Sequence, residues 1–295
     1  MLDPFVLGYL QGRWSAVPFD SRWASLHLAC MQQRVVVITG ASGGIGAALA
    51  ELLAERGERT VLVARRRAQL QEVAARCGRE SLTVIADVTE RAQVNGVVAA
   101  ALTRYGQIDA WVNNVGRGIT KSVTELTDDD LDEMMRVNVK SALYGMQAVL
   151  PHFKARSRGH LVNVSSLLGR IPYVASRSAY SAAKHALNAL TASLRVELRE
   201  MFPEIHVSLV SPGAVATDFG LNSLYGGIDS RQLPKAQPAL EVAQVIARLL
   251  DEPQADLYTR DSYHDQVAGY YAAADMADVE RRPPFAPTLR PANLR

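Results

Sequence analysis

Short runs of apolar residues, bounded by polar residues or glycine, alternate along this chain with longer segments of helical periodicity. The runs have the length and β-branched composition of buried strands in a parallel sheet. They predict strands at residues 34–39, 60–64, 82–86, 108–112, 159–164, 205–210 and 255–258. The intervening segments predict helices that include residues 47–56, 92–105, a long helix from 127, 180 to about 201, and 241–250. Strands alternating with helices predict one doubly wound α/β domain, with a sheet of about seven parallel strands.

A glycine-rich turn, Thr39-Gly40-Ala41-Ser42-Gly43-Gly44-Ile45-Gly46, joins the first predicted strand to the first predicted helix. Strand, glycine turn and helix form the context that a dinucleotide-binding fingerprint requires in a Rossmann-type domain. Gly40 permits the tight turn, Gly44 lets the backbone approach a pyrophosphate, and Gly46 lets the helix pack closely on the strand. The helix N-terminus then offers unpaired N–H groups to phosphate oxygens. The alternative is a glycine turn that binds no ligand.

Three arginines, Arg65, Arg66 and Arg67, directly follow the second predicted strand. A cofactor with a free ribose 2′-hydroxyl favours Asp or Glu about twenty residues past the glycines. Guanidinium groups suit a 2′-phosphate instead, and no carboxylate stands there to repel it. The pattern therefore favours NADP(H) over NAD(H). The alternative, a solvated basic start to the next helix, applies to Arg67 in particular.

Polar residues and glycines also follow the later strands, where an open α/β sheet delivers its functional groups. Asp87-Val88 follows the third strand, and Asp87 can accept from an adenine amino group or cap the next turn. Asn113–Gly116 follows the fourth strand, Ser165-Ser166 the fifth, and Ser211–Thr217 the sixth. These segments predict a ligand crevice along one edge of the sheet.

Tyr180 and Lys184 lie one helical turn apart, so that a phenol and an ammonium group share one helix face. A nearby cation lowers the pKa of a tyrosine and makes it a usable proton donor and acceptor. The spacing alone is a weak signal, because many solvated helices carry the same pair. Asn138 stands between two valines on an apolar face, which by itself indicates a hydrogen-bonded core residue rather than a catalytic one.

Taken together, these motifs resemble the classical short-chain dehydrogenase/reductase (SDR) family over residues 31–250. The glycine turn has that family's TGxxxGxG form, and Asn113–Gly116 resembles its NNAG motif with Val115 in place of Ala. Pro212-Gly213 is similar to its turn beside the nicotinamide, and Thr217 to its contact with the cofactor amide. The resemblance implies cofactor contacts from Thr39, Gly40, Ser42, Gly43, Gly44, Ile45, Gly46, Arg65, Arg66, Asp87, Val88, Asn114, Val115, Gly116, Tyr180, Lys184, Pro212, Gly213, Val215 and Thr217.

The same resemblance implies four catalytic residues. Tyr180 would exchange a proton with the substrate oxygen, Ser166 would hydrogen-bond that oxygen, Lys184 would lower the tyrosine pKa, and Asn138 would hold a water in a proton relay. Tyr180 follows Ser166 by fourteen positions, one more than is usual in the family, so both Ser165 and Ser166 stay open as the catalytic serine. The implied activity is interconversion of a carbonyl and a secondary alcohol with NADP(H).

Two other functions fit the same fold: a catalytically idle nucleotide-binding or scaffold protein, and an epimerase or dehydratase with a tightly held cofactor. The substrate pocket should draw on residues 117–123, 167–176 and a mobile loop at 218–237. Apolar residues in these segments favour a hydrophobic small molecule: Leu167, Leu168, Ile171, Tyr173, Phe219 and Leu224.

Composition narrows the partners and the setting. The chain has 295 residues, 48% of them apolar, and a net charge of +2, which gives no reason to expect nucleic acid or an anionic membrane. Cys30 and Cys77 are its two cysteines, and neither belongs to a metal-binding cluster. They favour a reducing, cytoplasmic setting without bound metal. No apolar run is long enough to span a membrane.

The two ends differ from the expected domain at residues 31–260. Residues 1–30 read as an extension with little fixed structure, with Met31 as an alternative start, or as an added helix that packs on the core or on a membrane. Residues 261–295 read as a C-terminal extension, with a Pro-rich tail at 281–295 that is expected to be disordered. The family resemblance further implies a homodimer or homotetramer, formed through the helices that hold Ser141 and Tyr180.

Overall fold

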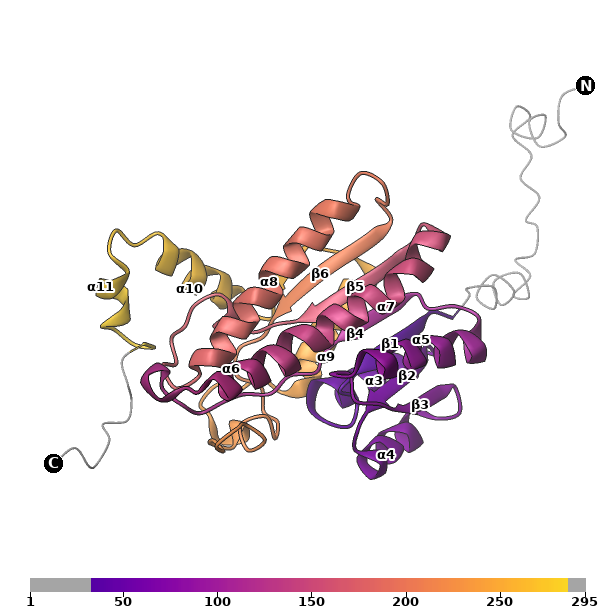
Figure 1. Ribbon diagram of the computed structural model, residues 1–295, viewed down its shortest axis with the longest axis horizontal. Coiled ribbons are helices and arrows are strands. Elements are labelled where there is room, and N and C mark those ends of the chain that lie inside the picture. Colours follow the sequence, from indigo (N-terminus) through magenta and orange to yellow (C-terminus); the bar gives the residue numbers. More distant parts are fainter. Residues whose placement is uncertain (1–32, 286–295) are drawn as a thin grey trace, which may run out of the picture. The chain divides into compact units, whose positions relative to one another are not determined.

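A parallel sheet of seven strands forms the centre of the domain, and the computed structural model describes residues 33–285 of the chain (Figure 1). The predicted N-terminal extension and residues 286–295 lie outside the described residues. The strands in chain order are β1 (Val35–Thr39), β2 (Arg59–Ala64), β3 (Ser81–Ile85), β4 (Ala110–Asn113), β5 (Gly159–Val164), β6 (Ile205–Ser211) and β7 (Asp256–Tyr258). Their order across the sheet is β3-β2-β1-β4-β5-β6-β7, and every pair is parallel. The predicted doubly wound sheet is confirmed.

Helices connect these strands and cover both faces of the sheet. They are α3 (Gly44–Glu55), α4 (Arg67–Cys77), α5 (Arg91–Tyr105), α6 (Asp128–Met135), α7 (Ser141–Arg156), α8 (Ser178–Leu198), α9 (Ala239–Asp251), α10 (Asp261–Tyr271) and α11 (Met276–Glu280). Within residues 33–285, none of these helices has the length and apolarity that crossing a bilayer requires.

Alternating side chains of the strands build two core layers. Val36 and Ile38 of β1 point to the layer filled by α3, α4 and α9. Val35 and Val37 point to the layer filled by α5, α7 and the end of α8. Because successive strand residues face opposite sides, an unbroken apolar run such as Val35–Ile38 is the pattern that a sheet buried on both faces needs.

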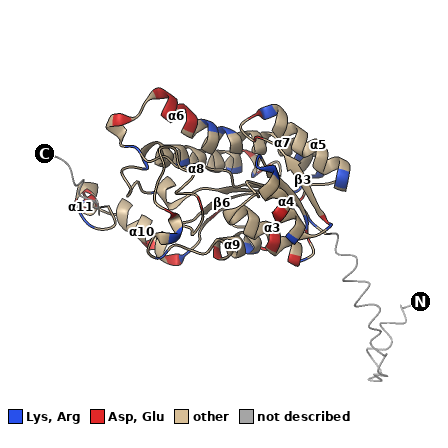
Figure 2. Cartoon of the chain, turned by 90° about the horizontal axis from the view of Figure 1, so that it is seen from below, with Lys and Arg blue, Asp and Glu red and all other residues tan. Residues whose placement is uncertain are grey.

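One predicted helix is interrupted in the structure. Thr127 is its N-cap, as predicted, and it forms a capping box with Asp130. Figure 2 shows acidic residues in red along α6, whose first turn holds three aspartates. Between α6 and α7 the chain forms a π-helical turn, η2 (Arg136–Lys140), which contains Asn138. A π-turn inside a helix often marks a functional position, and apolar periodicity does not predict one.

The C-terminal segment forms two helices that the sequence reading did not predict. Tyr263, Val267 and Tyr270 of α10 recur at helical spacing, which is the signal that was missed. Val267 and Tyr270 are buried against Leu167 and Ile171. Phe285 stacks on Tyr270, with 5.2 Å between ring centroids. Residues 281–285, for which disorder is expected from the sequence, are described in the structure, where the Phe285 ring also contacts that of Tyr173.

Candidate active site

The loops that carry the predicted site residues meet at one edge of the sheet. Strand β1 pairs with β2 on one side and with β4 on the other, so the chain reverses its winding direction between β1 and β4. The carboxyl ends also align, since Asn113 of β4 pairs with Asn163 of β5, and Val164 of β5 with Val210 of β6. Ligands of open α/β sheets bind in the crevice outside such a switch point.

The glycine turn after β1 is shaped by close backbone contacts. Gly40 and Gly44 have φ of +70° and +56°, a region that side-chain-bearing residues rarely adopt. A Cβ on Gly46 would lie 2.8 Å from Asn114 Nδ2 and would collide with the carbonyl oxygen of Gly40. Asn114 clamps the turn to the loop after β4, because its main-chain N–H donates to Thr39 Oγ1 at 2.9 Å. No side chain of the described residues caps the N-terminus of α3, so its first main-chain N–H groups are available to an anion. Such a helix start fits the pyrophosphate of a dinucleotide.

Two arginines lie beyond β2, beside this turn. Arg66 donates from Nη2 to Ser42 Oγ at 3.1 Å, so its guanidinium lies against the glycine turn. Arg65 has a side chain that is 68% exposed and lies 3.3 Å from Asp87, measured from Nη1 to Oδ2. Burial alone would raise the pKa of Asp87, but hydrogen bonds from Thr89 and the charge of Arg65 hold it below its usual value. The two guanidinium groups and the Asp87 carboxylate are thus available to hydrogen-bond the adenosine part of a cofactor.

The other residues predicted to contact a cofactor line the same edge. A Cβ on Gly116 would lie 3.0 Å from Asn138 Oδ1 and 3.5 Å from Lys184 Nζ, so glycine lets these side chains come close. A Cβ on Gly44 would lie 3.2 Å from Thr217 Cγ2, which places the segment after β6 against the start of α3. A larger residue at Gly213 would collide with the hydroxyl of Tyr263. Four other predicted contacts are apolar residues of these loops. Ile45 and Val215 pack on the core layer that contains α3, and Val88 and Val115 pack on the opposite layer. The main-chain carbonyl oxygen of Pro212 accepts a hydrogen bond from Leu167 N at 2.7 Å.

Tyr180 lies on the buried face of α8. Its ring packs against Phe219, with 5.4 Å between centroids, and its side chain is almost wholly buried. Burial raises the pKa of Tyr180 to about 12, while a hydrogen bond with the Ser166 hydroxyl and the charge of Arg177 act in the opposite direction. The expectation that Lys184 lowers the tyrosine pKa is therefore wrong, because burial outweighs the opposite effects of Ser166 and Arg177.

Lys184 is fully enclosed below the tyrosine. Its Nζ donates to the carbonyl oxygen of Val164 at 2.9 Å and lies 5.8 Å from the centroid of the Tyr180 ring. Burial lowers the pKa of Lys184 to about 8. Its ammonium group thus faces the carboxyl end of β5, beside Gly116 and the sheet edge that holds the glycine turn.

The two adjacent serines point to different partners. Ser165 Oγ donates to Asn188 Oδ1 of α8 at 2.5 Å, so its hydroxyl hydrogen is already bound to that helix. Ser166 Oγ accepts from Leu168 N at 3.1 Å and is the hydroxyl that acts on the Tyr180 phenol. The geometry therefore brings Ser166, rather than Ser165, to Tyr180.

Asn138 is fully buried on the π-turn, and protein groups satisfy most of its amide. Its Nδ2 donates to the carbonyl oxygens of Arg117 and Met134, each at 3.0 Å. Its Oδ1 accepts from Arg117 N at 3.0 Å. Both amide hydrogens are therefore used in fixing the loop after β4, and only acceptor sites of this residue are left for a water.

The apolar residues expected to line one pocket lie in two separate clusters. Leu168, Phe219 and Leu224 pack with Tyr180, as expected of a substrate pocket. In contrast, α10 and Phe285 cover Leu167, Ile171 and Tyr173. Leu167 and Ile171 are thus buried under the unpredicted C-terminal helices, which departs from the pocket expectation, whereas the Tyr173 phenol is close enough to Tyr180 to raise its pKa further.

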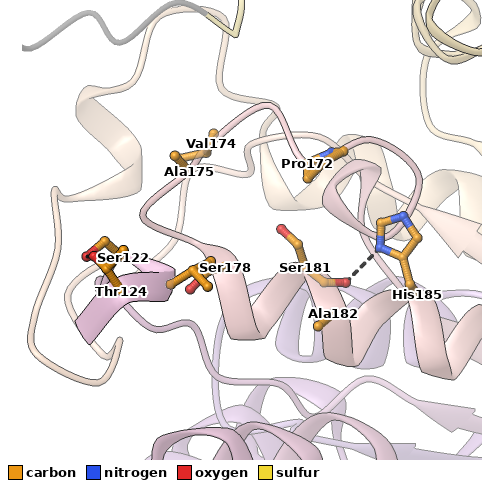
Figure 3. A pocket seen from close by; sticks show the side chains of 10 residues that line it. Ser122, Thr124, Pro172, Val174, Ala175, Ser178, Ser181, Ala182 and His185 are labelled. Carbon is orange, nitrogen blue, oxygen red and sulfur yellow. Dashed lines mark hydrogen bonds between the residues drawn. The ribbon is translucent and has the colours of Figure 1, made fainter. Parts of the chain in front are cut away.

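A hollow of about 600 Å³ lies on a different face of α8, between that helix and the segments 122–124 and 172–175 (Figure 3). Ser181, Ala182 and His185 line it, whereas Tyr180 and Lys184 do not. His185 is tied to its own helix through Nδ1 and the carbonyl oxygen of Ser181, 2.8 Å apart. The predicted catalytic residues Ser166, Tyr180 and Lys184 therefore do not line this hollow.

Known proteins resemble this chain in sequence and in fold. The sequence profile of the family described as short chain dehydrogenase matches residues 34–223. An uncharacterized oxidoreductase of Staphylococcus aureus is 33% identical over 228 residues, which cover 77% of this chain and 95% of that protein. One of Staphylococcus saprophyticus is 36% identical over 189 residues, 64% of this chain and 76% of its own.

Solved structures give the same result. A short chain dehydrogenase/reductase of Burkholderia phymatum in complex with NAD superposes with a TM-score of 0.74 at 26% identity, covering 89% of this chain and 99% of that one. An alcohol dehydrogenase of Thermococcus sibiricus, complexed with 5-hydroxy-NADP, gives 0.69 at 28% identity, with coverages of 78% and 97%. With the glycine turn, the parallel sheet and these matches together, the chain belongs to the short-chain dehydrogenase family of oxidoreductases.

Proposed function

We propose that this protein interconverts a carbonyl and a secondary alcohol on a hydrophobic small molecule, with NADP(H) as cofactor and Tyr180 as general acid and base. The observation that carries the proposal is the meeting of Ser166, Tyr180 and Lys184 beside Gly116, at the sheet edge that also holds the glycine turn. A bound nicotinamide supplies or accepts the hydride.

Each side chain has a role that its surroundings support. At neutral pH the phenol of Tyr180 is protonated, since its pKa is raised to about 12, and it can donate its proton to a carbonyl oxygen during reduction. Ser166 can donate to the same oxygen and stabilise its developing charge. Lys184, with a pKa lowered to about 8, can return a proton toward the phenol and bind ribose hydroxyls. Asn138 holds the loop after β4 and offers an acceptor to a relay water.

Arg65 and Arg66 support NADP(H) as the cofactor. Both guanidinium groups follow β2, and Arg66 is already placed against Ser42 of the glycine turn. Arg65 is largely exposed, so a 2′-phosphate can replace its weak ion pair with Asp87. Related structures bind both kinds of cofactor, an NADP derivative in one case and NAD in another.

The test is cofactor consumption against a panel of hydrophobic ketones and aldehydes, with NADPH and NADH compared at equal concentrations. NADPH should be oxidised with at least about tenfold higher kcat/KM than NADH, and Arg65→Ser with Arg66→Ser should reverse that preference. NADPH binding without turnover on any carbonyl would favour an idle nucleotide-binding protein. A cofactor that survives purification and shows no net oxidation would favour an epimerase or dehydratase.

We further propose that the protein forms a homodimer or homotetramer through α7 and α8. The outer face of α8 carries Leu190 at 37% exposure and Val196 at 63%, among exposed alanines at positions 182, 189 and 192. A face of small apolar residues on a long helix is suited to close packing against the same helix of a second copy.

A cytoplasmic setting is also part of the proposal. Cys77 is a buried free thiol, and burial raises its pKa to about 11. Such a cysteine is an inert core residue, as a reducing compartment allows.

A further inference from the structure

Arg177 stands at the start of α8, three residues before Tyr180, so both side chains leave the same side of the helix. Its guanidinium extends from the helix to two other segments. Nη1 donates to Ser223 Oγ at 2.5 Å and to the carbonyl oxygen of Ile119 at 3.2 Å. Arg177 therefore lies between the loop after β4 and the loop after β6.

The Arg177 guanidinium and the Tyr180 ring both lie close to the ring of Phe219. A Cβ on Gly118 would lie 2.6 Å from Arg177 Nη1 and 3.1 Å from Phe219 Cε1. The Phe219 ring in turn packs on the ring of Tyr180. The Arg177 charge also acts on the phenol, because it lowers the pKa of Tyr180 against the larger effect of burial. The cation is thus part of the surroundings of the reacting group.

No carboxylate of the described chain pairs with Arg177. Asp130 is held by Lys121 Nζ and the Tyr225 hydroxyl, each at 2.7 Å. Glu133 is paired with Arg117 and with a second arginine of η2. Arg177 itself has only neutral partners, a hydroxyl and a main-chain carbonyl. A partly buried cation loses hydration that neutral partners replace incompletely, so an anion at this position would be favoured.

We propose that Arg177 binds a carboxylate of the substrate whose carbonyl or hydroxyl group meets Tyr180. The inference rests on the proposed function and names its substrate class: oxo acids and hydroxy acids with an apolar carbon chain. A planar guanidinium presents parallel N–H donors that match a carboxylate. The chain between the two polar groups would lie along Leu168 and Phe219. Reduction adds a hydride from NADPH to the carbonyl carbon and a proton to its oxygen, giving the hydroxy acid and NADP⁺ with an unchanged carboxylate.

The test compares the full-length protein with a series of keto acids and their methyl esters: 4-oxopentanoate, 5-oxohexanoate and 6-oxoheptanoate. The series varies the distance between the carboxylate and the ketone. The best acid should exceed its ester at least about tenfold in kcat/KM, the value expected for one charge-assisted contact. In Arg177→Gln that ratio should fall to about one, and Arg177→Lys should restore part of it. A second readout is thermal stabilisation of the NADP⁺ complex by 5-hydroxyhexanoate against 5-hydroxyhexanamide.

Ser223→Ala is the matched control, because it removes a hydrogen bond of Arg177 and keeps the charge. The acid preference should persist in this variant. The proposal is overturned if acids and esters react equally in the unmodified protein, or if Ser223→Ala and Arg177→Gln lower the rates of both series alike. Acid-specific stabilisation that depends on Arg177, without turnover of any ketone, would support the anion site and contradict the proposed reaction. Absence of both acid-specific stabilisation and turnover would contradict both.

Discussion

The side chains of Tyr180 and Lys184 share the buried face of α8, and both are shifted toward their neutral forms. Burial raises the pKa of the phenol to about 12 and lowers that of the ammonium to about 8. Their spacing was readable from the sequence, but their burial depends on Phe219 and Val164, which come from distant parts of the chain. For the same reason the sequence reading assigned the cation near the phenol to Lys184 and overlooked Arg177.

Replacement of Tyr180 by Phe should lower kcat by about 10²–10⁴-fold, the usual contribution of a general acid. NADPH affinity should change little, because the aromatic ring and its packing on Phe219 are retained. Steady-state kinetics and a fluorescence titration with NADPH measure the two effects. Tyr144→Phe on α7, which removes a phenol outside the Ser166–Tyr180–Lys184 group and keeps the ring that stacks with Arg91, is the control. Substantial activity in Tyr180→Phe would mean that another group is the proton donor.

The pH dependence of stability should reveal the buried Lys184. Its folded-state pKa of about 8 lies below the ordinary 10.5, so between these values the unfolded chain binds more protons than the folded one. Stability therefore rises with pH across this window, and the penalty is fully present below pH 8. Relative to Lys184→Met, the unmodified protein should gain on the order of 3 kcal/mol from pH 7 to 10.5.

Urea unfolding at a series of pH values measures this gain. The exposed lysine at position 140, changed to Met, should follow the unmodified protein at every pH. Parallel profiles for Lys184→Met and the unmodified protein would show that Lys184 carries no burial penalty.

At the scale of elements, strands and their following loops were predictable because their signals are local. Strand β5 has the bounds predicted from its apolar run, and the glycine turn identified the start of α3 to within three residues. The π-turn at Asn138 and the cover that α10 forms over Ile171 were not predictable, since both depend on contacts between segments far apart in the chain. The local signals thus predicted the strands and the glycine turn better than the packing on the other side of the predicted site.

Gly46→Ala should disrupt the glycine turn that is proposed to bind the cofactor. A methyl group there meets the Gly40 carbonyl and Asn114 Nδ2, so the turn must open. NADPH affinity should fall at least about tenfold, since a phosphate-binding turn that shifts loses more than one hydrogen bond. Isothermal titration calorimetry measures the change. Unchanged affinity would show that the turn does not hold the pyrophosphate.

A glycine elsewhere provides the matched comparison. Gly96 stands in the middle of α5, and a Cβ there would meet nothing within 4 Å. Gly96→Ala should therefore raise the free energy of unfolding by about 0.5–1 kcal/mol without altering NADPH affinity.

At the scale of the whole molecule, assembly can be tested through the outer face of α8. Leu190→Asp with Val196→Asp places two charges on this face, and they should convert the assembly to monomers because buried unpaired charges are costly. Light scattering coupled to gel filtration measures the mass. Gln71→Asp on the exposed side of α4 is the control and should leave the assembly intact. A monomeric unmodified protein would contradict the proposed interface.

The packing of α10 and Phe285 on Leu167 and Ile171 links the end of the described chain to the loop that starts at Ser166. A proteolytic cut before α10 would uncover the apolar side chains of Leu167 and Ile171 beside the serine loop, while all seven strands and the glycine turn would stay in the remaining chain. Loss of α10 should therefore disturb the serine loop more than the glycine turn.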